Sequence, residues 1–241
     1  DESDIRLWRS EDLNQWKVIK SLWVWDDLGW EPPSGVEARL FAPELCQLQN
    51  HGTCLLVYSV RARETYTWIY KSISGKAEGP YQNIGDAYMV QGQDGFIFED
   101  DDESVYFLWD NGKIARLNDD LSGLQNERGQ LLSLQGQAIG SEGFGLAKVN
   151  NRYLLYAAQW QGNDPQHATY DLLYAFSEEI MGPYGPQNLA VPHGGHSTVF
   201  QGKDGRWHAT FFGHDKTAPF RGRFGLIDLD VTDGSAIRVR E

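Results

Sequence analysis

One pattern recurs along the whole chain and limits the fold more than any other feature. It is a strand that ends in a polar residue, followed by a short turn and a bulky residue. Successive copies lie roughly 45–60 residues apart, the length of one four-stranded propeller blade. The clear copies are residues 5–10 leading to Trp16, 68–72 leading to Gly79-Pro80-Tyr81 and 172–177 leading to Gly182-Pro183-Tyr184, and the weaker copies are 114–120 and 226–234.

A second kind of hairpin lies between these copies. Each has a strand, a turn rich in Asn, Asp or Gly, and an aromatic-rich strand, which is the sequence signature of a β-hairpin. Aromatic residues make up 13% of the chain, and 26 Gly and nine Pro supply turns, so the composition also favours strands. The four hairpins span residues 45–59, 96–109, 146–158 and 198–213.

The two patterns occur in unequal numbers. Five copies of the first and four hairpins of the second predict an all-β, five-bladed β-propeller whose first blade is incomplete. The copy at residues 5–20 has no hairpin ahead of it, so we expect roughly 30 or more residues before residue 1, or an abnormal first blade. Because no helical period and no low-complexity linker interrupt the chain, residues 1–241 are predicted to form a single domain.

Charge narrows the class of partner. The formal net charge is −13 and the pI about 4.8, so the surface repels phosphate backbones and anionic membranes. We therefore expect neither nucleic acid nor a membrane as a partner. No apolar run approaches the roughly 18 residues of a membrane span. A neutral small molecule or polymer suits such a chain better.

The cysteines and the first residues bear on the compartment. Cys46 and Cys54 flank the turn Asn50-His51-Gly52, an arrangement that suits either a disulfide across the hairpin or two reduced thiols. The chain opens on Asp1-Glu2-Ser3-Asp4, so an export signal is expected to have been removed or never to have existed. We expect a secreted or periplasmic protein, with a cytoplasmic one as the alternative.

Ionisable residues occur where the four hairpins of the second kind begin. The innermost strands of a propeller start near its axis, so residues at these starts are predicted to converge on one site. Acids that converge in this way have pKa values pushed apart by burial and like charge, which glycoside hydrolysis requires. The four starts are residues 39–44, 93–96, 140–144 and 194–198, and they carry Glu44, Asp94, Glu142 and His196.

Taken together and in order, these motifs resemble glycoside hydrolase family 43. Members carry Ser-x-Asp-Leu-x-x-Trp, then Trp-Ala-Pro-Glu/Asp, Asp-x-x-Phe-x-Asp-Asp, Glu-Gly, Ser…Gly-Pro-Tyr and Gly-His. This chain departs from that pattern at Phe41, where the family has Trp. The matching segments are residues 10–16, 41–44, 94–102, 142–144 and 195–196, together with the Gly-Pro-Tyr turns.

The resemblance implies three acids. Glu142 would be the general acid that protonates the leaving glycosidic oxygen, and Asp94 would tune its pKa by keeping it protonated near neutral pH. The general base, an Asp, would belong to the first inner strand of the first blade, which this sequence lacks. Inversion needs such a base on the opposite face of the sugar to activate water.

Further residues are predicted to contact the substrate or an ion. The resemblance implies that His196 lies beside a calcium ion in the central channel, although a neutral imidazole would also hydrogen-bond an axial water. It also implies that Arg221 contacts the sugar and that Phe41 stacks on it. Trp160, after the third hairpin of the second kind, is a candidate for lining the cleft.

Two acidic segments are assigned structural roles instead. Glu44 is expected to bond to backbone inside the fold. Asp100-Asp101-Asp102 is expected to be a solvated hairpin turn and not a metal-binding loop.

The resulting hypothesis is an inverting glycosidase acting on pentose-containing polysaccharide or oligosaccharide, with arabinofuranosyl or β-xylosyl residues as substrates. The alternative is a non-catalytic carbohydrate-binding propeller that has lost the general base. A sialidase-like propeller would require an arginine triad and a nucleophilic Tyr, which the sequence does not show.

Overall fold

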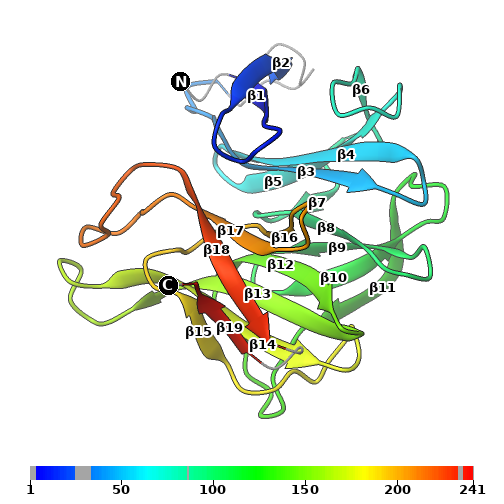
Figure 1. The fold of residues 1–241 in the computed structure, drawn as a ribbon. Coiled ribbons are helices and arrows are strands. Elements are labelled where there is room, and N and C mark those ends of the chain that lie inside the picture. The colour runs from blue at the N-terminus through cyan, green and yellow to red at the C-terminus, as the bar shows by residue number, and fades with distance from the viewer. Residues whose placement is uncertain (1–3, 25–33, 86, 233–235, 241) are drawn as a thin grey trace. The chain divides into compact units, whose positions relative to one another are not determined.

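The computed structural model describes residues 4–24, 34–85, 87–232 and 236–240, and all regular structure within them is β-strand (Figure 1). The all-β prediction is therefore confirmed. None of these residues forms a helix of the length and hydropathy that crossing a membrane requires. The turn predicted at Asp233-Gly234 lies outside the described residues.

The first sheet has only two strands, β1 (Asp4–Arg9) and β2 (Lys17–Val24). The turn between them is organised by Asp12, whose Oδ1 accepts hydrogen bonds from the backbone amides of Asn14 and Gln15 at 2.9 and 2.8 Å. A short polar side chain that accepts hydrogen bonds from the amides two and three residues later favours a turn over a continued strand.

The second sheet has the strand order β3-β4-β5-β6, and β7 pairs with β5 as well. Its middle strands, β4 and β5, are largely buried, and Leu56, Tyr58 and Trp68 belong to its buried core. Burial on both faces favours runs of apolar residues. The strands are β3 (Arg39–Leu48), β4 (Thr53–Arg61), β5 (Thr65–Ser72), β6 (Tyr81–Asn83) and β7 (Val90–Gln91).

The register of the β3–β4 hairpin decides the state of the cysteines. Cys46 pairs with Leu55, and Cys54 pairs with Gln47. Because side chains alternate between the two faces of a strand, this one-residue offset places the two thiols on opposite faces. Both cysteines are free, and burial raises the pKa of Cys46 to about 12.

The third sheet has the order β11-β10-β9-β8. The acidic segment forms the β8–β9 turn, as predicted, although Asp100 is buried and only Asp101 and Asp102 are exposed. The amide of Asp101 donates to Asp100 Oδ1 at 2.8 Å, and the amide of Ser104 donates to Asp102 Oδ1 at 2.9 Å, so these carboxylates hold the turn. The strands are β8 (Phe96–Glu99), β9 (Val105–Trp109), β10 (Lys113–Leu117) and β11 (Leu124–Gln130).

The last two sheets follow the same plan, in the orders β12-β13-β14-β15 and β16-β17-β18-β19. Their first strands are neighbours, as are their last strands, so the two blades pack face to face. The strands are β12 (Glu142–Val149), β13 (Arg152–Gln161), β14 (Thr169–Ser177), β15 (Asn188–Val191), β16 (Val199–Gln201), β17 (Trp207–Phe211), β18 (Gly225–Thr232) and β19 (Ala236–Val239).

The two Gly-Pro-Tyr segments form matching turns in different blades. Both Gly-Pro peptide bonds are cis, and the Tyr hydroxyl donates to the backbone carbonyl four residues earlier in each case. These bonds run from Tyr81 to Ala77 at 2.8 Å and from Tyr184 to Ile180 at 2.7 Å. The repeat in the sequence is therefore a repeat in structure.

The blade count differs from the prediction of five. Four sheets have four or five strands and are the blades of a β-propeller, whereas the first sheet has two strands among the described residues. The copy at residues 5–20 forms this two-stranded sheet, and no further described strand pairs with it.

The chain divides into two compact units, each described here by itself. The first contains residues up to Phe107 together with Ala115–Glu127. The second contains Leu108–Ile114 and the residues from Arg128 onward. The prediction of a single domain stays a prediction.

Candidate active site

The four predicted starts lie where the first strand of each blade begins. Phe41 lies near the start of β3, Asp94 two residues before β8, Glu142 at the first position of β12 and His196 three residues before β16. Each of these strands is at one end of its sheet's strand order. The repeat pattern therefore placed these residues at equivalent positions of four blades.

Glu142 occupies a bulged strand start. It pairs with Ala158, the register then shifts, and Gly145 pairs with Tyr156. The first of the two residues between them, Gly143, has φ +59°. A bulge redirects the side chains beside it. The Glu142 carboxylate accepts a hydrogen bond at 2.8 Å from the hydroxyl of Tyr170, the second residue of β14.

Tyr170 is itself held firmly. It is 3% exposed, and its amide donates to Asp215 Oδ2 at 3.0 Å. The amide of Gly195 donates to the Tyr170 carbonyl at 2.9 Å. A Cβ atom at Gly195 would lie 2.4 Å from the Tyr170 ring, so only glycine allows the backbone to approach this closely. The donor to Glu142 is thus fixed from several sides.

Asp215 anchors this cluster. It is 1% exposed and accepts bonds from the Tyr170 amide, from His193 Nδ1 at 2.9 Å, and from the amide and hydroxyl of Thr217 at 3.0 and 2.8 Å. Burial raises the pKa of Asp215, but these hydrogen bonds outweigh burial and leave it below its usual value. An ionised carboxylate therefore organises the loop residues around Tyr170.

Asp94 lies in the first unit and is also buried. Its amide donates to Ser59 Oγ at 3.1 Å, and Gln93 Nε2 donates to its Oδ2 at 3.1 Å. Its φ is +56°, and Asp tolerates this left-handed conformation better than most residues. A buried carboxylate held in this conformation is a candidate functional group.

Trp160 lies beside Tyr170 in the second unit. The two residues are paired in the β13–β14 ladder, with ring centroids 4.9 Å apart, and Trp160 is 43% exposed. The ring of His214 meets both of them edge-on, at 5.6 and 5.5 Å. Trp160 is therefore close to the residue that binds Glu142, as its predicted role requires.

Phe41 and Arg221 were the other predicted sugar contacts. Phe41 lies at the bulged start of β3, with the guanidinium of Arg61 5.1 Å from its ring centroid. Arg221 is exposed on the turn between β17 and β18, where the Gly222 amide donates to the Gly213 carbonyl. Their contact with a sugar stays a prediction.

His196 was the predicted calcium neighbour. It has φ +57°, and its ring packs against Gly143, where a Cβ would lie 3.0 Å from the imidazole Cγ. Calcium takes six to eight oxygen ligands. His196 offers one imidazole nitrogen, and the described residues contain no group of three His, Cys, Asp or Glu that could hold a metal ion. The residues present therefore do not fit a calcium site by themselves, and the ion stays a prediction.

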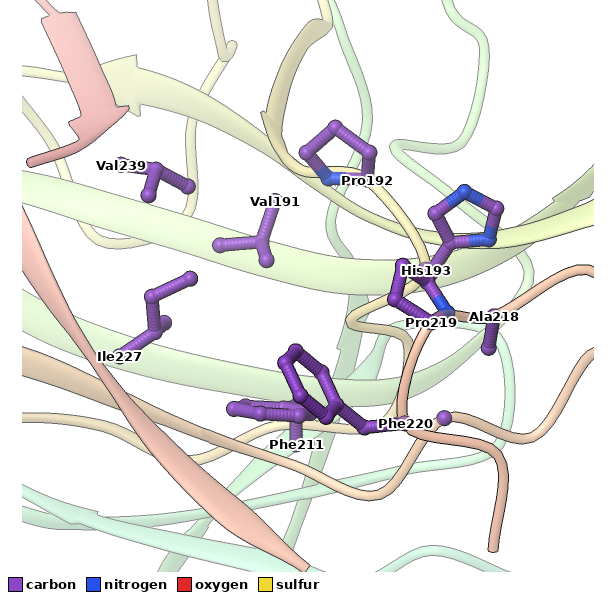
Figure 2. A pocket seen from close by; sticks show the side chains of 10 residues that line it. Val191, Pro192, His193, Phe211, Ala218, Pro219, Phe220, Ile227 and Val239 are labelled. Carbon is purple, nitrogen blue, oxygen red and sulfur yellow. The ribbon is translucent and has the colours of Figure 1, made fainter. Parts of the chain in front are cut away.

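A cavity of about 370 Å³ lies between the last two blades, away from these residues. Figure 2 shows its apolar wall, with the Phe211 and Phe220 rings close together and His193 at the side. His193 connects it to Asp215. The lining includes no carboxylate and none of the predicted site residues, so it is not the place for acid catalysis. Its lining is Val191, Pro192, His193, Phe211, Gly213, Ala218, Pro219, Phe220, Ile227 and Val239.

Sequence reasoning missed Tyr170, Asp215 and His193. Tyr170 follows from pairing the 146–158 hairpin with the next strand, because that register sets it opposite Trp160. Asp215 lies in an irregular loop 45 residues later in the chain, and no local pattern marks it.

Comparisons with known proteins give a consistent picture. The model of a family described as "Glycosyl hydrolases family 43" matches residues 1–228. A curated relative, the beta-D-galactofuranosidase of Aspergillus niger, is 25% identical over 218 residues, which cover 79% of this chain and 60% of the relative. The chain thus spans only about 60% of that relative's length.

Solved structures share the fold. An endo-1,4-beta-xylanase from Bacteroides thetaiotaomicron has a TM-score of 0.74 at 24% identity, covering 98% of this chain and 85% of that one. An exo-1,5-alpha-L-arabinanase from a bovine ruminal metagenomic library has a TM-score of 0.73 at 14% identity, covering 99% and 90%. These likenesses concern the fold alone.

Proposed function

The chain belongs to glycosyl hydrolase family 43, and on this premise we propose that it hydrolyses pentose-containing saccharides with Glu142 as general acid. The single observation that carries the proposal is the 2.8 Å hydrogen bond from Tyr170 to Glu142 at the bulged start of β12. A carboxyl group at the first strand of a blade, oriented by a buried and anchored donor, is suited to proton transfer in a fixed direction.

The reaction follows from this orientation. Oε1 of Glu142 accepts from Tyr170, so the acid's proton is carried on Oε2 and delivered to the glycosidic oxygen as the bond to the anomeric carbon breaks. Water attacks the anomeric carbon from the opposite face and loses a proton to the general base. The family resemblance implies that this base is an Asp on the first inner strand of the first blade.

Asp94 keeps its predicted role as the residue that tunes the acid. A negative charge near a carboxylic acid favours its protonated form. Asp94→Asn should therefore move the alkaline limb of the pH–rate profile to lower pH. An unchanged limb in a folded variant would remove Asp94 from this role.

The substrate class rests on the sugars named for similar proteins. Family membership together with the arabinanase and xylanase neighbours supports arabinofuranosyl and β-xylosyl substrates, and the Aspergillus relative adds galactofuranosyl to the panel. The net charge of −13 is compatible with a neutral carbohydrate.

The test compares wild type with Glu142→Gln on aryl arabinofuranosides, xylosides and galactofuranosides. Each sugar is offered with a good leaving group, 2,4-dinitrophenol, and with a poor one, phenol. Loss of a general acid should lower kcat on the phenyl glycosides by about 10³ and on the dinitrophenyl glycosides far less, because a good leaving group needs no proton.

Glu127→Gln, a change to an exposed acid on β11, is the matched control and should behave as wild type. Equal losses on both leaving groups would argue against an acid role for Glu142. No turnover by folded wild-type protein on any glycoside would favour a carbohydrate-binding propeller without catalysis.

A further inference from the structure

A series of aromatic rings leads away from the Glu142 side of the molecule. Neighbouring rings have centroids 4.9 to 6.1 Å apart, so the series is continuous. We call it the aromatic row. Its members are Trp160, Tyr170, His214, Phe212 and Phe224, and all belong to the second unit.

The strand directions place the whole row on one edge of the two blades. In each antiparallel sheet the first strand begins, the second ends and the third begins at the same edge. Trp160 is near the end of β13, and Tyr170 is near the start of β14. Phe212 directly follows β17, and Phe224 directly precedes β18. Glu142, which begins β12, is on this edge as well.

The loop between β17 and β18 carries the outer half of the row. It runs over residues 212–224, although the strands it joins pair directly at Phe211 and Gly225. Two strands of this kind need only a turn of two to five residues. The extra length is therefore available for function, and it brings Phe212 and His214 to within 5.2 Å of each other.

Exposure of the outer rings makes this a binding surface. Phe224 is 92% exposed, and its ring centroid lies 6.1 Å from that of Phe212. Transfer of an aromatic side chain out of water lowers the free energy, and contiguous exposed apolar groups mark sites of interaction. Sugar rings present apolar C–H faces to aromatic rings and polar hydroxyls to solvent, so a saccharide suits a row of rings at the surface.

We propose that the aromatic row is a subsite for the leaving-group half of an oligosaccharide substrate, a proposal that rests on the proposed function. The row meets the acid through Tyr170, whose hydroxyl is 2.8 Å from Glu142 Oε1, and then runs to the β17–β18 loop of the next blade. The acid protonates the oxygen that departs with the leaving group. The sugars of the leaving group therefore lie next to the acid, where the aromatic row begins.

The experiment measures binding in the Glu142→Gln background, so that it does not depend on turnover. Linear arabino-oligosaccharides and xylo-oligosaccharides of two to six units are titrated by calorimetry against this protein and against versions that also carry Trp160→Ala or Phe224→Ala. The matched control is Phe220→Ala. Phe220 is in the same loop and is 57% exposed, but it packs on Phe211 at the cavity instead of on the row.

The proposal requires the affinity for at least one series to rise with chain length. Trp160→Ala should then weaken binding of the longest oligosaccharide about tenfold and Phe224→Ala about threefold, while Phe220→Ala changes it less than twofold. Affinity that is independent of length, or equal losses in all three variants, would overturn it. Absence of measurable binding to both series would overturn it as well.

Failure of the proposed function gives a different result. In that case Glu142→Gln would hydrolyse phenyl glycosides as fast as wild type, whatever the row binds.

Discussion

The first strands of two blades, β3 and β12, begin with the same bulge but carry different side chains. In β3, Phe41 pairs with Ser59, and the register then shifts so that Glu44 pairs with Val57. In β12, Glu142 pairs with Ala158 and Gly145 pairs with Tyr156. Three residues on one strand are thus set against two on the other in both blades. By this alignment Phe41 and Glu142 occupy equivalent positions.

The residues on the second and third strands that lie beside each bulge also differ between the two blades. Arg61 and Thr65, which are paired in the second sheet, correspond to Trp160 and Tyr170 in the fourth. Arg61 lies over the Phe41 ring, whereas Tyr170 donates a hydrogen bond to Glu142. Both blades thus have a bulged strand start with a partner residue facing it. The side chains at these few positions differ, with an aromatic ring beside a guanidinium in one blade and a carboxylate bound by a hydroxyl in the other.

The largest expected effect separates the two acids nearest these bulges. Glu142→Gln should lower kcat on phenyl glycosides by about 10³, while Glu44→Gln should leave it within twofold, because Glu44 is three residues past the equivalent position. Steady-state kinetics of the two variants measures this. A comparable loss in Glu44→Gln, with unchanged thermal stability, would contradict the alignment of the blades.

The next effect concerns how each blade is anchored. Asp215→Ala should lower the free energy of unfolding by about 3 kcal/mol, because it removes the acceptor of the buried Tyr170 amide and of the donors of His193 and Thr217. Ser59→Ala removes neutral bonds to Asp94 and Thr67 and should cost about 1 kcal/mol. Urea denaturation at pH 7 compares them, and equal losses would show that the charge of Asp215 adds nothing.

The lowered pKa of Asp215 also makes its contribution to stability depend on pH. A carboxylate whose folded-state pKa lies below 3.8 contributes stability that is fully present above about pH 4 and is lost as pH falls through the folded value. The stability gap between wild type and Asp215→Asn should therefore narrow below pH 4. A gap that stays constant down to pH 3 would contradict an ionised Asp215.

A smaller effect tests the bulges themselves. Gly143→Ala should cost about 2 kcal/mol, since φ is +59° and the added Cβ would lie 3.0 Å from the His196 ring. Ala42 has φ +48° at the equivalent position of β3, so Ala42→Gly should be neutral or stabilise by about 0.5 kcal/mol. Thermal melts of both variants check this, and destabilisation by Ala42→Gly would break the equivalence.

The smallest effect isolates the hydrogen bond to the acid. Tyr170→Phe should lower kcat on phenyl glycosides about tenfold and leave kcat on dinitrophenyl glycosides nearly unchanged, because the carboxyl group loses the hydrogen bond that orients it for proton transfer. Steady-state kinetics with the two leaving groups measures this. A purely structural role for Tyr170 would lower kcat on both kinds of substrate equally.

Sequence by itself determined the blades and the positions of their first strands. Hairpin patterns and Gly-Pro-Tyr turns depend on neighbouring residues, because turn chemistry and the two-residue period of a strand act locally. That is why residues 142–144 and 94–96 could be assigned to blade starts without coordinates. The described residues form four blades instead of the five predicted. The pattern at residues 5–20, typical of an outer hairpin, forms a sheet of only two strands among those described, which is consistent with an incomplete first blade.

Only the tertiary structure decided what surrounds the acid. The donor to Glu142 comes from Tyr170, 28 residues later, and its anchor Asp215 comes from another blade's loop a further 45 residues along. Such contacts depend on how sheets pack and how long loops fold, and no local propensity specifies them. The aromatic row likewise joins residues from β13, β14 and the β17–β18 loop, which become neighbours only when the two blades pack face to face.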